Sequence, residues 1–266
     1  MIRHTVPVLA LVLVAGTASS TSLATTRGAA RPTARAAADR CEQPGPYALP
    51  LTDEPVDLDP AEFTIRIDNP YWPMRPGTVW HYVEHTSGEA PSEAARVTVR
   101  VTRRTRLIEG VRVRVVRDVV RSADGDIEEA TSDWYAQDSG GSIWYFGEFT
   151  QEFEDGEPVS SQGSFEHGKD GAQAGVVVPA TPVAGCSYRE EYKAGEAEDR
   201  ATVLSTGERI RTRFGLRHHV LQTSNTSPLE PAVLENKLYV RGIGPVLEVD
   251  LSPQLGTAEL VSITRP

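Results

Sequence analysis

The stretch that decides the fold runs from residue 111 to 157 and reads VRVRVVRDVVRSADGDIEEATSDWYAQDSGGSIWYFGEFTQEFEDGE. Its opening valines alternate with arginines, which places apolar side chains on one face of a strand and charged side chains on the other. Asp124-Gly125, residues 138–141 and Asp155-Gly156 supply the residue types that tight hairpin turns require. We therefore predict an antiparallel meander of four strands across residues 111–166.

The same pattern extends to both sides of this stretch. Val97, Val99 and Val101 alternate with polar residues, and no segment shows the 3.6-residue period of a long amphipathic helix. Further strands are expected near residues 79–86, 187–193, 198–206, 216–224, 233–241, 245–251 and 257–264. A single sheet must cover its apolar face by curling or by folding over. We predict an all-β, single-domain protein with a strongly curved antiparallel meander sheet, shaped as a half-barrel or a barrel.

The N-terminal residues have the three parts of an export signal. Arg3 precedes an apolar run over residues 6–15, and small residues follow that run. The apolar run is shorter than the roughly 20 residues that span a membrane, so we expect no stable membrane insertion. We assign residues 1–25 to a cleavable signal peptide, residues 26–60 to a low-complexity, mostly disordered leader, and residues 61–266 to a β-rich secreted domain.

Charge and cysteine content narrow the possible partners. The chain has a formal net charge of −10, whereas nucleic-acid-binding proteins usually carry a basic footprint. We therefore expect neither a nucleic-acid partner nor an anionic membrane surface. The two cysteines are Cys41 and Cys186, and an exported protein meets an oxidising environment. We expect a disulfide between them that pins the N-terminal segment to the middle of the domain.

Three stretches of the chain resemble a known family. They are NPYWPMRPGTVWHY at residues 69–82, DWYAQDSGGSIWYFGE at residues 133–148, and a third set that ends in YVRGIG at residues 239–244. Over residues 66–250 the chain is similar to an uncharacterised family of secreted or lipid-anchored bacterial proteins. Its last hairpin also looks like that of curved-sheet envelope proteins, including lipoprotein carriers. The resemblance implies an all-β fold and an extracytoplasmic location but no reaction, and this chain lacks the cysteine of the lipid-anchored members.

Aromatic residues gather on one predicted hairpin. Trp134 and Tyr135 lie on its first strand, and Trp144 and Tyr145 lie on its second strand. Strand alternation sends the two members of each pair to opposite faces, so we expect one face to join the core and the other to present exposed aromatics. Aromatic rings beside acids can bind sugars, peptides or cationic groups. Cross-strand packing alone would give the same pattern.

Acidic residues are dense in two regions, around Glu148 and around Glu190. A carboxylate pair at a suitable separation could perform acid–base catalysis, as in glycoside hydrolases, although a solvated charged face has the same composition. Asp124, Asp126 and Glu128 offer the oxygen ligands that calcium prefers, although Asp-Gly is also an ordinary hairpin turn. We name these three as the metal candidates, and we assign no catalytic residue and no cofactor.

The leading hypothesis is a secreted, non-enzymatic protein that binds a small apolar or amphiphilic ligand on the concave face of its sheet. The glycine-bearing loop over residues 168–175 would lie near the mouth. The candidate ligand-binding residues are Trp134, Tyr135, Trp144, Tyr145, Glu148 and Glu190. Two alternatives stay open. One is an envelope protein-interaction or structural module that uses a sheet edge or outer aromatics, and the other is a carboxylate-dependent hydrolase of extracellular polymer.

Overall fold

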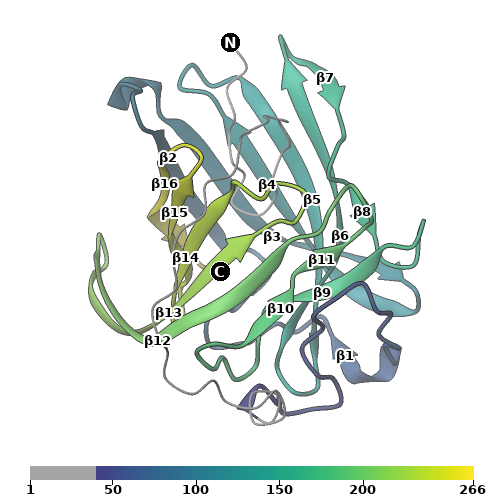
Figure 1. Ribbon diagram of the computed structural model, residues 1–266. Helices are drawn as coiled ribbons and strands as arrows, with labels where there is room; N and C mark the ends of the chain where they lie inside the picture. Colours follow the sequence, from purple (N-terminus) through teal and green to yellow (C-terminus); the bar gives the residue numbers. More distant parts are fainter. Residues whose placement is uncertain (1–39) are drawn as a thin grey trace, which may run out of the picture.

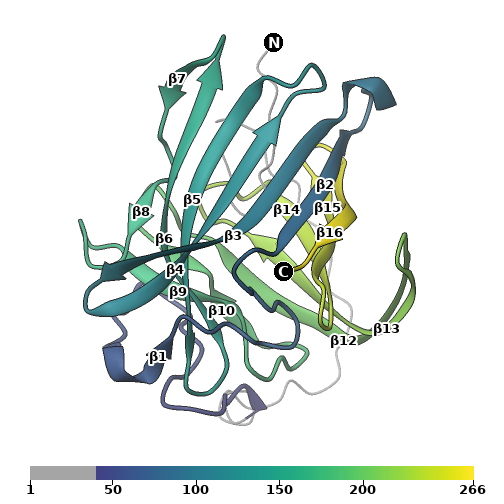
Figure 2. The same ribbon diagram turned by 180° about the vertical axis from the view of Figure 1, so that it is seen from behind.

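The alternating segments of the sequence become strands of one 16-stranded antiparallel sheet in the computed structural model, which describes residues 40–266. The sheet curls until its two ends approach each other, as Figure 1 and the reverse view in Figure 2 show. The predicted all-β class and the strongly curved antiparallel sheet are confirmed. The signal peptide predicted over residues 1–25 lies outside the described residues.

Two short 3₁₀ turns accompany the strands in the described part of the chain, and none of its helices is long and apolar enough to cross a membrane. The 3₁₀ turns are η1 (Pro60–Glu62) and η2 (Pro91–Glu93). The strands are β1 (Phe63–Thr64), β2 (Val79–Thr86), β3 (Ala95–Ile108), β4 (Val111–Arg121), β5 (Ile127–Asp138), β6 (Ile143–Glu154), β7 (Glu157–Ser160), β8 (Phe165–Glu166), β9 (Gln173–Val178), β10 (Ser187–Arg189), β11 (Glu191–Tyr192), β12 (Arg200–Thr212), β13 (Gly215–Thr226), β14 (Leu234–Val240), β15 (Gly244–Ser252) and β16 (Gly256–Thr264).

The meander predicted from the deciding stretch is confirmed, because β4, β5, β6 and β7 pair in succession as antiparallel neighbours. The turn between β4 and β5 places Gly125 at a φ of 99°, and the Gly125 amide donates to the carbonyl oxygen of Ser122 over 3.1 Å. Gly141 and Gly156 also have positive φ in the next two turns, where glycine avoids the strain of a side chain. Asp-Gly and Gly-Gly pairs therefore mark the hairpins correctly.

The sheet closes at a seam formed by residues 187–192. On one side β10 pairs with β12, and on the other side β11 pairs with β9, so one short segment joins both ends of the sheet. Glu190 lies between the two pairings, and its amide donates to the carbonyl oxygen of Asp199 over 2.7 Å. The Arg189 guanidinium adds two hydrogen bonds to the carbonyl oxygen of Ala174, at 3.0 and 3.2 Å. The ladder of strand pairs is interrupted here, so the sheet is nearly closed and these few contacts hold its two ends together.

The segment before β1 is packed against the barrel. Cys41 forms a disulfide with Cys186, immediately before the seam, as the sequence predicts. Tyr47 stacks on Phe63 with 5.5 Å between ring centroids, and the carbonyl oxygen of Pro50 accepts a hydrogen bond from the Arg189 amide. The sequence predicts a mostly disordered leader over residues 26–60. In residues 40–60, the part of it that the structure describes, the disulfide and aromatic packing anchor the chain, and no local sequence pattern reveals these contacts.

Large aromatic side chains fill part of the barrel interior. Trp72 lies 5.7 Å from Tyr135 and 6.2 Å from Tyr239 between ring centroids. The Trp80 indole donates to the carbonyl oxygen of Ile243 over 2.7 Å, and the Tyr82 hydroxyl donates to a backbone carbonyl oxygen over 3.0 Å. The polar atoms of Trp80 and Tyr82 are thus paired, as is typical of a packed core, whereas Trp72 Nε1 and the Tyr135 hydroxyl have no hydrogen-bond partner among the described residues. The concave face is therefore filled here and does not line an empty apolar cavity.

Reduction of the disulfide should lower the stability of the protein. The cross-link spans 145 residues, and in the chain-entropy model a loop of that length stabilises the folded state by about 5 kcal/mol. We expect dithiothreitol to lower the Tm by about 10–20 °C, measured by circular dichroism. The Cys41→Ala/Cys186→Ala variant should melt at the reduced temperature with or without reductant. An unchanged Tm after complete reduction would contradict this expectation.

The seam should not tolerate a side chain at Gly175. A Cβ there would lie 2.4 Å from the carbonyl carbon and oxygen of Glu190. Gly175→Ala should therefore cost about 1–3 kcal/mol, as overpacked sites do, with a Tm lower by about 3–10 °C. Gly207→Ala is the matched control, because a Cβ at Gly207 meets only the Ser205 hydroxyl, at 4.0 Å. Equal melting temperatures for the two variants would rule out the close contact.

Candidate functional site

The structure separates the six predicted ligand-binding residues into three groups. Tyr135 and Tyr145 point into the barrel and stack with 4.8 Å between ring centroids and 16° between ring planes. Glu148 joins them inside, because a register shift between β5 and β6 at Trp134 and Tyr135 changes the alternation. Trp134 and Trp144 lie on the outer face, and Glu190 lies at the seam. The assignment of these residues to a ligand stays a prediction.

The outer aromatics are covered, which corrects the expectation of an exposed aromatic face. Trp144 is fully buried beneath Tyr47 and Phe63, at centroid distances of 5.4 and 6.0 Å. Trp134 is 5% exposed, because the guanidinium carbon of Arg106 lies 4.2 Å from its ring centroid. The residues that cover these rings come from distant parts of the chain, so strand alternation alone cannot indicate their burial.

Inside the barrel, two carboxyl groups share one tyrosine hydroxyl. The Tyr145 hydroxyl lies 2.8 Å from Asp133 Oδ1 and 2.6 Å from Glu148 Oε2. A tyrosine hydroxyl carries a single proton, so it donates to one carboxyl group and must accept a proton from the other. Burial raises the pKa of Asp133 to about 7. Burial and repulsion from Asp133 hold the pKa of Glu148 well above its usual range. At neutral pH the two carboxyl groups therefore retain a proton between them, in addition to the proton of the tyrosine hydroxyl.

These carboxyl groups belong to a larger cluster that we name the acidic chamber. Its members come from five strands and the seam, and each is at most 9% exposed. They are Asp118, Glu129, Asp133, Glu148, Glu190, Glu191, Glu235 and Glu248, together with Lys237. Burial is the main cause of the raised pKa values, which reach about 8 for Glu129 and about 8 for Glu248. Burial disfavours the ionised form of a carboxyl group, and neighbouring carboxylates add to the effect.

Lys237 provides the balancing positive charge within the chamber. Its ammonium nitrogen lies 3.9 Å from Glu235 Oε2. Burial lowers the pKa of Lys237, but Glu248, Glu235 and Glu190 outweigh this effect and hold the pKa well above its usual range. Glu190 also accepts a hydrogen bond from the Asn225 side-chain amide over 2.6 Å. One lysine cannot neutralise eight ionised carboxylates. The remaining carboxyl groups must therefore hold protons or meet another cation.

Several chamber oxygens have no hydrogen-bond partner among the described residues. They include both carboxyl oxygens of Asp118 and one oxygen each of Asp133, Glu235 and Glu248. Buried polar atoms in folded proteins are almost always paired, so an unpaired carboxyl oxygen marks a place where a donor is missing. Five such oxygens in one interior provide a set of acceptors for protons, water or a cationic ligand.

A narrow pocket connects the acidic chamber with solvent, and we name it the acidic mouth. Glu148 and Glu191 of the chamber line the mouth as well, so its inner end is part of the chamber. The cavity itself is small, about 10 Å³, and opens onto a solvent-filled space of about 300 Å³ in front of it. Its lining consists of Glu148, Gly163, Glu191, Glu196, Ala197, Glu198, Asp199, Ser227, Leu229 and Glu230. The lining is dominated by carboxyl groups, so the mouth favours a positively charged group.

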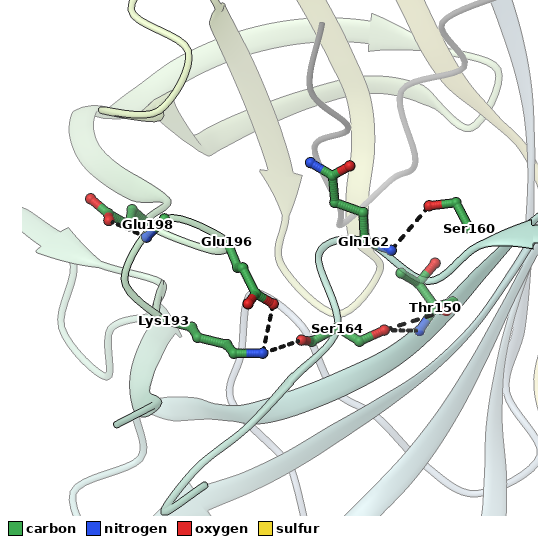
Figure 3. Close-up of polar contacts among 8 residues, drawn as sticks. Thr150, Ser160, Gln162, Ser164, Lys193, Glu196 and Glu198 are labelled. Atoms are coloured by element: carbon green, nitrogen blue, oxygen red, sulfur yellow. Dashed lines mark hydrogen bonds and ion pairs between the residues drawn. The ribbon is translucent and has the colours of Figure 1, made fainter. Parts of the chain in front are cut away.

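Two loops form the rim of the mouth, and Lys193 connects them (Figure 3). The Lys193 ammonium lies 2.6 Å from Glu196 Oε2 and 3.5 Å from the carbonyl oxygen of Ser164. The Ser164 hydroxyl accepts from the Thr150 amide and so ties its loop to β6, while Glu198 accepts from the Gly195 amide. These contacts hold the rim in one arrangement and leave Glu191 at the inner end of the pocket.

Two further features predicted from the sequence lie away from this site in the structure. Asp124, Asp126 and Glu128 lie at the hairpin between β4 and β5, and no metal-binding group of three acidic, histidine or cysteine side chains forms within residues 40–266. The glycine-bearing loop over residues 168–175 contributes no residue to the lining of the acidic mouth. Gly168 contacts Glu109 at the turn between β3 and β4, and residues 173–175 belong to β9.

Sequence reasoning missed about half of the chamber, namely Asp118, Glu129, Glu235, Lys237 and Glu248. A signal was present on β14, where Glu235 and Lys237 share a face with Tyr239 by strand alternation. Tyr239 is 3% exposed, so its face of the strand is the inner one. Charged residues in a strand are normally assigned to the solvent-facing side, because they are rarely buried. That assumption leads a reader of the sequence to overlook an acidic interior.

No protein-family model matches the chain, and no curated protein matches it. One similar solved structure is a protein from Bacteroides fragilis named as exported and as having a YmcC-like fold, with 12% identity and a TM-score of 0.43 over 73% of this chain and 99% of that chain. Another is a protein from Parabacteroides distasonis named as a lipoprotein, with 10% identity and a TM-score of 0.39 over 73% of this chain and 98% of that chain. Likenesses at this level assign no function, and the family resemblance of the three sequence stretches stays a prediction.

The acidic chamber should make the protein less stable as pH rises. The folded state keeps protons on Glu129 and Glu248 up to a pKa of about 8, whereas the unfolded chain releases them near pH 4. The folded state therefore binds more protons between these limits. The stabilisation is complete below about pH 4 and is lost as pH rises through about 8. We expect the free energy of unfolding in urea, followed by tryptophan fluorescence, to fall steadily from pH 5 to pH 9.

Glu129→Gln isolates one contribution to this slope. The amide does not titrate, so the decrease between pH 5 and pH 9 should shrink by an amount on the order of a few kcal/mol. Glu154→Gln, at an exposed position on the same side of the molecule, should leave the slope unchanged. A protein that gains stability between pH 5 and pH 8 would show that the chamber carboxyl groups are ionised in the folded state.

Proposed function

We propose that the protein is a secreted, non-enzymatic binding protein whose acidic mouth takes up a slim cationic group, such as the primary ammonium of an alkylamine. The observation that carries this proposal is the mouth itself, which is lined mainly by carboxyl groups and shares Glu148 and Glu191 with the acidic chamber. An ammonium group has three donors and a full positive charge, so it matches these acceptors in both chemistry and charge. The disulfide supports export, since disulfides are typical of oxidising compartments.

Burial and repulsion from Asp199 hold the pKa of Glu191 at the inner end of the mouth well above its usual range. A bound ammonium would favour the ionised carboxylate and displace its proton. Uptake of the amine would therefore release protons and would strengthen as pH rises from 5 to 8. Leu229 and Ala197 offer apolar contacts to the carbon chain that carries the ammonium. The ligand class is thus an amine on a short, linear, partly apolar chain.

The functions that the sequence suggests have less support. An apolar ligand on the concave face would have to displace packed rings such as Trp72 and Trp80, each at most 2% exposed. A polymer hydrolase needs its carboxylate pair in an accessible cleft, whereas Asp133 is fully buried and shares the Tyr145 hydroxyl with Glu148. An interaction module that uses the outer tryptophans would need them exposed, and Trp134 and Trp144 are at most 5% exposed.

Binding of 1,5-diaminopentane tests the proposal. We expect saturable heat in isothermal titration calorimetry at pH 8, weaker binding at pH 5, and a measured enthalpy that depends on the ionisation enthalpy of the buffer. Glu191→Gln should weaken binding at least tenfold, because it removes the charge at the inner end of the mouth. Glu154→Gln, at an exposed position far along β6, should bind like the unmodified protein.

Two comparison ligands test whether binding needs a positive charge and whether that charge must be an ammonium group. 1,5-Pentanediol has the same chain without charge and should not bind. Calcium chloride should not compete with the diamine, since the proposal is for an ammonium and not for a metal ion. No diamine binding at millimolar concentration, or equal binding by the Glu191→Gln variant, would refute the proposal.

A further inference from the structure

The outer face of β3 to β6 carries an open groove of about 900 Å³, a volume that includes the adjoining solvent. Figure 2 shows these strands side by side toward the viewer. The groove is lined by Arg104, Thr105, Arg106, Val115, Ser132, Trp134 and Phe149. We name it the arginine groove. It lies on the opposite face of the sheet from the acidic chamber, and it combines basic side chains with an apolar floor.

An irregularity in β3 directs Arg104 toward this groove. Between Val101 and Thr105 the strand shifts register against β4, so extra residues bulge from the sheet. The buried guanidinium of Arg114 supports the bulge by donating to the carbonyl oxygens of Arg103 and Thr102 over 3.2 and 3.5 Å. Bulges of this kind re-aim side chains and are frequent beside functional sites. The groove is therefore a built feature of the fold.

The positions of the other two guanidinium groups are also fixed. Arg106 lies flat on the Trp134 ring and pairs with Glu166 through Nη2 at 2.5 Å, which leaves its remaining donors available. Arg117 donates to the hydroxyl of Ser132, a residue of the groove lining. Planar guanidinium groups present paired donors that match the oxygens of a phosphate.

Positive charge on this face is not balanced within the described residues. Arg100 stands opposite Arg117 in the register of β3 and β4, and Arg96 stands opposite Arg121. Like charges directly opposite each other destabilise a sheet. None of the ion pairs within residues 40–266 involves Arg104 or any of these four arginines. Arg104 lines the groove itself, so an anion there would meet a guanidinium group that no ion pair within residues 40–266 occupies.

Apolar surface adjoins the guanidinium groups. Phe149 is 45% exposed although it is a large ring in the middle of β6, and Val115 and Trp134 form the floor beside it. A free inorganic anion would leave this surface unused. A bilayer contact would need a broader set of exposed apolar side chains, and Phe149 is the exposed large apolar residue of the groove lining.

We propose that the arginine groove is a second binding site, for a single-chain amphiphile with a phosphate head. The phosphate meets Arg104 and Arg106, which line the groove, and the apolar chain lies along Val115 and Phe149. Two guanidinium groups match the doubly charged oxygens of a phosphate monoester better than a singly charged carboxylate. The site does not depend on the acidic mouth, since the two share no residue.

Decyl phosphate below its micelle concentration is the probe. Calorimetry should detect binding that weakens with added sodium chloride, and Arg104→Gln should lower the affinity at least tenfold. Arg104 is exposed and its side chain forms no contact that the fold needs, so this variant should fold normally. Arg209→Gln, an exposed arginine on β12, is the matched control and should bind like the unmodified protein.

The remaining measurements separate this ligand from related ones. Inorganic phosphate should bind at least tenfold more weakly than decyl phosphate, and Phe149→Ser should reduce this difference. Decyl maltoside should not bind. Equal binding by Arg104→Gln, equal affinity for decyl maltoside, or binding to phosphatidylglycerol vesicles without binding to decyl phosphate would each overturn the proposal. Glu191→Gln should leave decyl phosphate binding unchanged, so failure at the mouth and failure at the groove are distinguishable.

Discussion

Closure at the seam is the constraint on which the rest of the structure depends. Residues 187–192 pair with β12 at one end and with β9 at the other, and the carbonyl of Glu190 lies so close to Gly175 that no side chain fits there. Closure removes the interior from water. Without it the carboxyl groups of the chamber would ionise at their ordinary pKa values, and the Tyr145 hydroxyl would have no reason to hold two of them together. A backbone contact thus sets the chemistry of the interior.

Acidic side chains gather on the inner face of the sheet and arginines on its outer face. The net charge of the chain is therefore a poor guide to the charge of its outer surface. Eight carboxyl groups of the chamber point inward, while arginines such as Arg100 and Arg104 point outward from β3. The formal net charge of −10 counts the buried acids as though they were ionised and exposed. Several of them hold protons near neutral pH, so the effective charge is less negative. The arguments from composition against anionic partners therefore do not extend to the outer face of β3 to β6.

Local features of the sequence predict most of the sheet and little of the site. Alternating valines and Asp-Gly turns identify β4 to β6, and the strand expected near residues 79–86 is β2 as observed. The inward direction of Tyr135 and Tyr145 follows from the same alternation. Burial of Trp144 does not follow, because Tyr47 and Phe63 cover it from more than 80 residues away. The chamber cannot be predicted from the sequence either. Acids alternate with apolar residues along these strands, and only the closure of the sheet shows which face is the inner one.

The barrel can be completed only by its last strand. β16 pairs with β2 on one side and β15 on the other, and β2 carries Trp80 and Tyr82 of the aromatic core. Until residues 256–264 are available, β2 has an open edge and the ring of strands is interrupted between β15 and β2. Pairings between such distant segments form slowly, because a long loop must close before they gain any contact. The chain therefore stays incompletely folded until its last strand has been made.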